Sequence, residues 1–326
     1  MHVPFSAVGD FFRQHSTFVI LSHVRPDGDA YGSTLGLGLC LREMGKTVYM
    51  YNEDGLTPRF HYMPGSENIQ VTPAQPPADA KIVAVDTADA ARLGKTFVSW
   101  NRTPDLNIDH HVSNPLYGEL NVVVSDAPAA SQVLYELLVT NGLPITSDIA
   151  SNFFIGISTD TGSFRYRGTT TRTFEIAAAL TKAGANPAFL AQQAYQSYPA
   201  SRFRLLQAVL QTTQFSADNR IVWCKLDQDM YTTTGATTDD TEGLIEYFLM
   251  TETVEVAALL EVISHTCIRV SLRSRGKVNV SRIAAAYGGG GHHSAAGIRT
   301  SLPYTELESS LIRDIEIALA ASPSTE

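Results

Sequence analysis

The chain has 326 residues, of which 44% are hydrophobic and 17% charged, values typical of a globular protein rather than a disordered or membrane-spanning one. Its length predicts about two domains, each large enough to bury its own core. The net charge of −9 and the pI of about 5.5 argue against a protein that tracks long nucleic acid through a broad basic surface. They allow a small anionic ligand in a local pocket.

Three further features favour a cytoplasmic protein without membrane partners. The sequence has no apolar run of about 18 or more residues that could span a bilayer. Asp10 and Arg13 interrupt the N-terminal segment where a secretory signal needs an apolar stretch. Cys40, Cys224 and Cys267 lie far apart without a metal-type spacing, as expected of reduced thiols.

In chain order, the N-terminal half alternates β-rich runs with helical patterns, which predicts an α/β domain with a parallel sheet and crossover helices. Predicted strands cover residues 17–22, 47–51, 81–85 and 106–108. Predicted helices cover residues 31–44, 147–159 and 174–182, and the second of these delivers Asp160 at its end.

The second half begins with a helical segment broken by prolines, residues 187–211, which we interpret as a connector. Beyond it the pattern predicts strands over 221–226, 256–264 and 268–273, a glycine-rich turn, and a closing helix over 304–320. The tail 322–326 is expected to fray. The predicted division is therefore a catalytic domain 1–186, the connector 187–211, and a smaller α/β domain 212–326.

Four short motifs in the first half carry groups that bind metals. His23, Asp27 and Asp29 directly follow the first predicted strand, where the carboxyl ends of parallel strands form the usual binding crevice. Asp86 follows another strand, Asp109, His110 and His111 follow the next, and Asp160 comes at the end of a predicted helix. Each motif alone has an ordinary explanation as a turn, a helix cap or a surface loop.

Taken together, the motifs resemble the DHH phosphoesterase family in residue type, order and spacing over nearly the whole N-terminal domain. The resemblance implies that His111 contacts the scissile phosphate while Asp109 orients the histidines. It also implies two divalent metal ions, the first held by His23, Asp27 and Asp86, and the second by Asp29, Asp86, His110 and Asp160. Asp86 would bridge the two ions.

Charge and ligand chemistry agree with that implied site. Two divalent cations would neutralise the four carboxylates, which would otherwise repel one another. Carboxylate oxygens mixed with imidazole nitrogens suit Mn²⁺, with Mg²⁺ or Co²⁺ as alternatives. Arg25 stands where the family often has asparagine, and Tyr31 where it often has an aliphatic residue, so the detail of this loop is expected to differ.

The second half carries a basic strand and a glycine-rich turn. Arg269 and Arg273 would share one face of the strand, which alone could be a solvated edge. The turn allows backbone N–H groups to approach an anion closely, but it lacks the lysine of a nucleotide-binding P-loop. Strand and turn together resemble the DHHA1 domain, and the resemblance implies six substrate-binding residues: Arg273, Ser274, Gly289, Gly290, Gly291 and His292.

DHHA1 domains accompany DHH domains in NrnA-type oligoribonucleases and 3'-phosphoadenosine 5'-phosphate (pAp) phosphatases, where substrate binds in the cleft between the domains. We therefore expect a two-metal phosphodiesterase or phosphatase that acts on short RNA or DNA oligonucleotides or small nucleotides, with no long nucleic acid as partner. Alternatives are hydrolysis of pApA or a cyclic dinucleotide, a manganese-dependent inorganic pyrophosphatase, and a catalytically silent nucleotide sensor. The sequence leaves substrate length, cleavage polarity, the resident metal and homodimer formation open.

Overall fold

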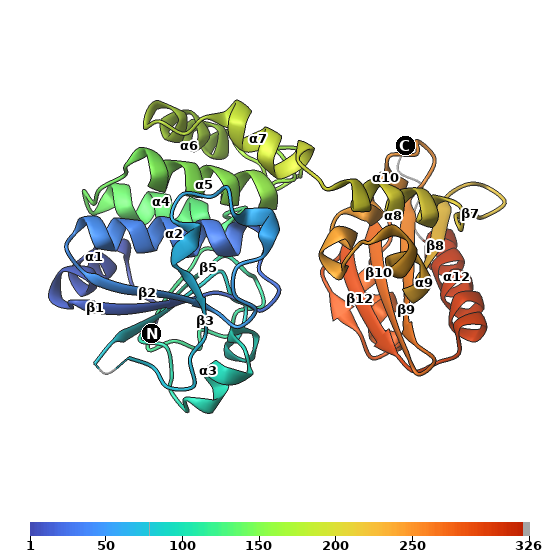
Figure 1. Ribbon diagram of the computed structural model, residues 1–326, viewed down its shortest axis with the longest axis horizontal. Coiled ribbons are helices and arrows are strands. Elements are labelled where there is room, and N and C mark those ends of the chain that lie inside the picture. Colours follow the sequence, from blue (N-terminus) through green and yellow to red (C-terminus); the bar gives the residue numbers. More distant parts are fainter. Residues whose placement is uncertain (78, 322–326) are drawn as a thin grey trace. The chain divides into compact units, whose positions relative to one another are not determined.

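The computed structural model describes residues 1–77 and 79–321 (Figure 1), so the predicted frayed tail lies outside the described residues. The chain divides into two compact units, Met1–Ser197 and Tyr198–Glu326. This division lies between α7 (Pro187–Gln196) and α8 (Ala200–Leu210), within the segment that we interpret as a connector. Over the described residues, no helix is long and apolar enough to cross a membrane.

The first unit is built on a six-stranded parallel sheet, which confirms the predicted α/β class. Its strands are β1 (Thr17–Leu21), β2 (Thr47–Asn52), β3 (Ile69–Val71), β4 (Lys81–Val85), β5 (Leu106–Asp109) and β6 (Leu120–Val123), in the order β3-β2-β1-β4-β5-β6. The strand order reverses between β1 and β4. Ligands of open parallel sheets bind beside the carboxyl ends of strands at such a reversal.

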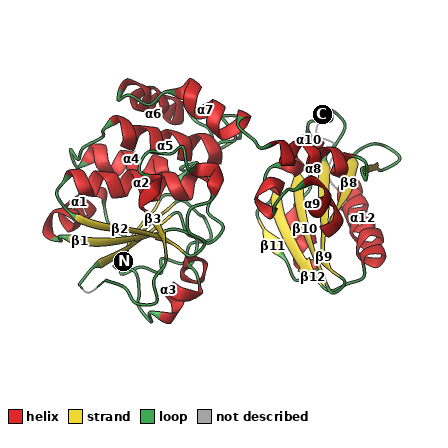
Figure 2. Ribbon diagram, in the orientation of Figure 1, coloured by secondary structure: helices red, strands yellow, loops and turns green. Residues whose placement is uncertain are grey.

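Helices cover both faces of this sheet (Figure 2). One face carries α2 (Gly28–Glu43), α4 (Ala130–Thr140) and α5 (Ser147–Asp160), with α1 (Phe5–Gln14) packed on α4, and the main core lies beneath them. The other face carries α3 (Lys95–Ser99) over a smaller apolar cluster. The last helices of the unit, α6 (Thr171–Lys182) and α7, pack on α5.

Glycines on α2 allow it to pack closely against α5. A Cβ atom at Gly32 would lie 2.6 Å from the backbone oxygen of Asn152, and one at Gly36 would overlap a phenylalanine ring of α5. Because the two helices touch backbone to backbone, the start of α2 with Asp29 lies beside the end of α5 with Asp160. The glycine pattern therefore contributes directly to the assembly of the site.

The second unit is a smaller domain with a mixed six-stranded sheet, in the order β11-β12-β10-β9-β8-β7. The strands are β7 (Gln214–Phe215), β8 (Ile221–Asp227), β9 (Val256–Ser264), β10 (Cys267–Ser274), β11 (Gly290–Gly291) and β12 (Ala295–Thr300), and only β8 and β9 pair in parallel. One face packs on α8, α9 (Gln228–Thr234) and α10 (Leu244–Leu249). The other packs on α11 (Val280–Ala286) and α12 (Tyr304–Ala321).

Candidate metal centre

The loop after β1 brings His23 and Asp27 together. Asp27 is the N-cap of α2, because its Oδ1 accepts hydrogen bonds from the backbone of Asp29 and Ala30, both at 3.0 Å. This leaves the Asp27 Oδ2 atom, which lies 3.8 Å from His23 Nε2. The other ring nitrogen of His23, Nδ1, lies 2.9 Å from the Val24 carbonyl oxygen, and a bond there places the proton on Nδ1. The Nε2 lone pair of His23 therefore faces the carboxylates.

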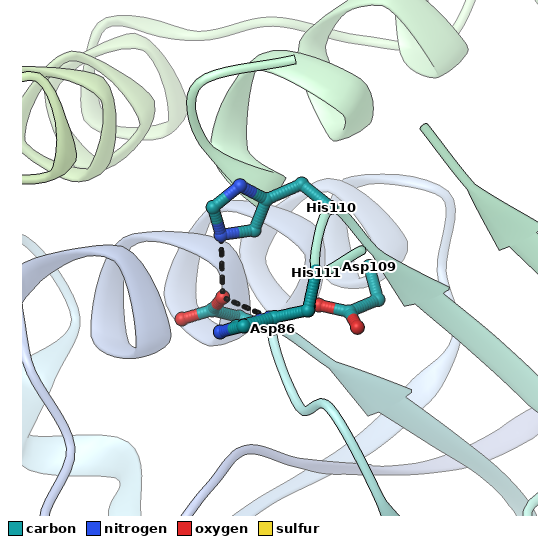
Figure 3. Close-up of side chains that lie close together, drawn as sticks. All are labelled: Asp86, Asp109, His110 and His111. Atoms are coloured by element: carbon teal, nitrogen blue, oxygen red, sulfur yellow. Dashed lines mark hydrogen bonds and ion pairs between the residues drawn. The ribbon is translucent and has the colours of Figure 1, made fainter. Parts of the chain in front are cut away.

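Asp86 directly follows β4 and lies between two histidines. Its backbone is left-handed, with φ of 48°, and its nitrogen donates to the Ile108 carbonyl at 3.0 Å. Asp86 Oδ2 lies 3.5 Å from His23 Nε2, and Asp86 Oδ1 lies 3.4 Å from His110 Nε2 (Figure 3). Each oxygen of this buried carboxylate thus faces a different imidazole.

His110 presents a ring nitrogen to several carboxylates at once. Its Nδ1 atom lies 3.2 Å from the Ala127 carbonyl, while its Nε2 atom lies 3.3 Å from Asp160 Oδ2 and 4.0 Å from Asp29 Oδ2. Both His110 Nε2 and Asp86 Oδ1 are buried atoms without a hydrogen bond to the described residues. Because a lone pair that faces carboxylates needs a proton or a cation between them, this arrangement fits a metal ion.

Asp29 is a fully buried carboxylate of the centre, with no exposed surface. Its Oδ2 accepts from the backbone nitrogen of Ala130 at 2.6 Å, and its Oδ1 from that of Ser131 at 2.9 Å. These are the first residues of α4, whose own N-cap, Ala129, has no side-chain acceptor. The positive end of the α4 dipole therefore stabilises an anion at Asp29.

Mutual proximity shifts the pKa values of these groups. Burial, reinforced by the charge of Asp86, raises the pKa of Asp29 to about 7, and burial with the charges of Asp29 and Asp27 also raises the pKa of Asp160. Burial opposes charge on His23, but its hydrogen bond to Asp86 outweighs this and raises the pKa of His23 to about 9. Burial likewise opposes charge on His110, but the adjacent Asp86 carboxylate outweighs it and raises the pKa of His110 to about 11. The metal-free cluster therefore retains protons that a bound cation would displace.

A second network holds the histidine that follows. His111 Nδ1 lies 2.8 Å from Asp109 Oδ1, and the Asn114 amide donates to Asp109 Oδ2 at 2.6 Å. The same Asn114 nitrogen also donates to Asn107 Oδ1 at 2.9 Å. Both bonds require the nitrogen of the Asn114 amide, and not its oxygen, to face Asp109 and Asn107. Burial opposes charge on Asp109, but the bond to His111 lowers its pKa. Asn114 was not among the predicted site residues, because the sequence marks it only by its position a few residues after the histidine pair.

The structure brings all the predicted metal ligands into one connected cluster. Three groups each have ligand atoms within 4.8 Å of one another: His23, Asp27 and Asp86; Asp29, His110 and Asp160; and Asp86, Asp109, His110 and His111. Asp86 belongs to two of these groups, as does His110. The two oxygens of Asp109 are engaged by His111 and Asn114.

In the second unit the predicted basic residues are paired within the fold. Arg273 donates through Nε to Glu246 Oε1 at 2.8 Å and through Nη1 to the Leu272 carbonyl at 3.1 Å. Arg269 forms an ion pair with the buried Glu261. The Ser274 hydroxyl is buried and donates to the Val278 carbonyl at 2.7 Å, within its own turn. The charge of this strand is therefore partly compensated by side chains distant in sequence.

The glycine-rich turn forms the β11–β12 hairpin. Gly290 and Gly291 pair with Gly297 and Ala296, and a Cβ atom at Gly289 would lie 2.2 Å from the Gly297 carbonyl oxygen. The next residue, His292, is exposed, and its backbone nitrogen donates to the Ala295 carbonyl at 2.7 Å. Ala295 is the register partner of Arg273 on β10, so the predicted substrate residues lie on neighbouring parts of this unit.

Comparison with known proteins gives matches in both units. Residues 17–157 match the model of the DHH family, N-terminal domain, and residues 226–316 match that of the DHHA1 domain. A Thermus thermophilus protein named bifunctional oligoribonuclease and PAP phosphatase NrnA is 37% identical over 281 residues, which are 85% of this chain and 82% of that protein. The Bacillus subtilis protein of the same name is 27% identical over 290 residues, covering 87% of this chain and 89% of the relative.

A solved structure extends the likeness to the fold of nearly the whole chain. An exopolyphosphatase-related protein from Bacteroides fragilis superposes with a TM-score of 0.86 and 25% identity. The match covers 97% of this chain and 95% of that one.

Proposed function

Because the chain belongs to the DHH family and carries a DHHA1 domain, we propose that it hydrolyses short oligoribonucleotides and 3',5'-bisphosphonucleotides such as pAp to nucleoside 5'-monophosphates. The Thermus thermophilus relative combines both activities in its name. Among the structural observations, the position of Asp86 between His23 and His110 carries the proposal. Its one carboxylate presents an oxygen to each of two adjacent ligand sets.

We propose that this cluster holds two divalent ions, with Mn²⁺ favoured and Mg²⁺ or Co²⁺ as alternatives. The first set would be His23, Asp27 and Asp86, and the second Asp29, Asp86, His110 and Asp160. Bound ions would neutralise the carboxylates and stabilise the negative charge that develops on a phosphoryl group. The supporting observation is that both histidines present an Nε2 lone pair to carboxylates.

Two side chains then serve catalysis, His111 by contacting the substrate and Asp109 by positioning His111. With Nδ1 donating to Asp109, the His111 ring is fixed, and in its protonated form it would donate through Nε2 to an oxygen of the scissile phosphate. Asp109, held in turn by Asn114, maintains that tautomer and orientation. An oligonucleotide and pAp both present a 5'-phosphorylated nucleoside, and in each the bond that breaks joins the 3'-oxygen to phosphorus.

In the second unit we propose that Arg273, Ser274, Gly289, Gly290, Gly291 and His292 bind the nucleotide part of the substrate. The hairpin backbone offers N–H groups to an anion, and Arg273 lies on β10, the strand that pairs with β12 of the hairpin. A cytoplasmic location and a homodimer also stay proposals.

A substrate panel tests this function. Wild-type protein with Mn²⁺ is incubated with pAp, pApA, short RNAs, cyclic dinucleotides and pyrophosphate, and the products are separated by chromatography. We expect AMP from pAp and nucleoside 5'-monophosphates from the short RNAs. The Asp86→Ala variant controls for contaminating nucleases. Activity confined to pyrophosphate or to cyclic dinucleotides, or no activity at all, would each overturn the proposal in favour of one of its alternatives.

A further inference from the structure

The segment after α5 has an unusual backbone. Gly162, Ser163 and Phe164 are consecutive residues with left-handed backbones, at φ of 56°, 60° and 63°. Residues other than glycine rarely adopt this conformation, which costs about 1 kcal/mol or more for each, and such strain concentrates at functional sites. The strained turn directly follows Asp160 and Thr161, at the edge of the proposed metal centre.

Several contacts hold this turn in place. The buried Thr161 accepts a hydrogen bond through its hydroxyl from the Phe164 nitrogen at 3.0 Å, and the Ser163 nitrogen donates to the Ser158 carbonyl at 2.6 Å. The Phe164 ring packs between Phe154 and a stacked Phe174, with centroids 5.8 Å and 5.5 Å away. The turn is therefore a fixed feature of the first unit.

The turn presents Arg165, Tyr166 and Arg167 at the surface. All three residues are exposed, with 51% of Tyr166 accessible. The backbone nitrogens of Arg165 and Tyr166 donate to the Thr161 carbonyl at 2.9 Å and 3.0 Å, which anchors them to the residue next to Asp160. A Cβ atom at Gly162 would lie 2.4 Å from the Tyr166 ring, so one side of that ring rests on the glycine.

The charge of this segment contrasts with that of the whole chain. No acidic residue occurs from Thr161 to Phe174, although the chain has a net charge of −9. Arg172 is neutralised by ion pairs with Glu136 and Glu175. Arg165 instead donates to the Gly162 carbonyl, and within the described residues no carboxylate pairs with Arg165 or Arg167. A positively charged, aromatic segment thus follows Asp160, a proposed metal ligand, within a few residues.

We infer that Tyr166 and Arg167 form a binding site for the nucleotide on the far side of the scissile phosphate, with Tyr166 stacking on its base and Arg167 contacting a phosphate. An aromatic ring beside arginine is the combination with which proteins bind single-stranded nucleic acid without reading its sequence. The inference rests on the proposed function and deepens it. An oligonucleotide has a nucleotide beyond the scissile phosphate that can occupy this site, whereas pAp has none. This site would favour oligonucleotides over pAp.

The test compares substrates that differ only in that nucleotide. The kcat and KM values for pAp, pApA and pApApA are measured in wild type, Tyr166→Ala, Tyr166→Trp and Arg167→Ala. We expect Tyr166→Ala to lower the ratio of kcat/KM for pApA to that for pAp about tenfold, mainly through the KM for pApA, since stacking on one base has about this effect. Tyr166→Trp, which keeps the stacking surface, should restore the ratio. Arg167→Ala should reduce the salt dependence of the KM for pApApA, in which the nucleotide beyond the scissile phosphate carries a phosphate of its own.

Matched controls are Phe189→Ala on α7 and Arg313→Ala on α12, an exposed aromatic residue and an exposed arginine outside this segment, and both should keep the wild-type ratio. A Tyr166→Ala ratio equal to that of wild type, or a Tyr166→Trp ratio as low as that of Tyr166→Ala, would overturn the inference alone. A wild-type protein inactive on all three substrates would overturn the proposed function together with it.

Discussion

The carboxylate of Asp29 on α2 lies 2.6 Å from the backbone nitrogen of Ala130, the first residue of α4. This contact joins two segments a hundred residues apart and gives Asp29 a structural role besides the proposed binding of metal. The two roles can be separated, because an amide retains a hydrogen-bond acceptor but is a poor metal ligand.

We predict that Asp29→Asn and Asp29→Ala both weaken metal binding, and that Asp29→Ala is the less stable protein by about 1–2 kcal/mol. Both changes remove the charge of Asp29. The difference in stability between the two variants therefore measures the contribution of the side-chain acceptor for the N–H groups of Ala130 and Ser131. Urea unfolding of the two variants in excess chelator measures it. Equal stabilities would contradict the capping role.

Metal binding should release protons and become tighter as the pH rises from about 7 to about 9. The pKa of His23 is raised from 6.5 to about 9 and that of His110 from 6.5 to about 11. Their protons stabilise the metal-free fold fully below pH 6.5, and this contribution is lost as the pH rises through the raised pKa values, so the metal-free protein should lose stability over the same range. Calorimetric titration with Mn²⁺ in buffers of different ionisation enthalpy counts the protons released. No release near pH 7 would contradict the proposed ligand roles of these histidines.

Asn114 should act as a positioning residue for Asp109 and His111. Asn114→Ala removes the donor to Asp109 Oδ2 and should destabilise the protein by about 1–3 kcal/mol while lowering kcat more than it raises KM. Asn114→Asp places a second carboxylate against Asp109 and should be worse in both respects. Thermal unfolding and steady-state kinetics on pAp measure these effects. An Asn114→Asp variant with wild-type kcat would show that the network has no part in catalysis.

Arg273→Ala should reduce kcat/KM for pAp by roughly 2–5 kcal/mol in transition-state free energy if it breaks a buried charge-assisted contact. Hydrolysis of bis-p-nitrophenyl phosphate, which lacks the nucleotide groups, should scarcely change. Glu246→Gln is the control, because it removes the ion-pair partner of Arg273 but keeps the arginine. Equal losses on both substrates in Arg273→Ala would contradict a role in binding the nucleotide.

Strong local patterns made much of the fold predictable. Strands β4 and β9 have the predicted limits, since each is a buried apolar run, and α5 ends at Asp160 as the periodicity indicated. The first-unit sheet and the smaller second domain were also predicted. The pattern did not identify α1, α4 or β6, although α1 and α4 contribute to the main core and α4 supplies the N–H groups that bind Asp29.

The remaining features depend on contacts between distant residues. The sequence around Arg273 contains only basic charges and does not indicate an ion pair. The partner of Arg273, Glu246, lies on another element. The close contact between α2 and α5 at Gly32 likewise becomes apparent only when the two helices are packed together. The three left-handed residues after Asp160 follow from side-chain packing around Thr161 and Phe164, which no local pattern encodes.

The central claim is a two-metal centre joined by Asp86, and a metal titration tests it most directly. Metal-free wild type and Asp86→Ala are titrated with Mn²⁺ while bound metal and the release of AMP from pAp are measured in the same samples. We predict that wild-type activity rises until two ions are bound per chain, and that Asp86→Ala neither binds both ions nor releases AMP, because its two neighbouring ligand sets lose their shared carboxylate. A folded Asp86→Ala protein that retains two ions and near-wild-type turnover would contradict the account.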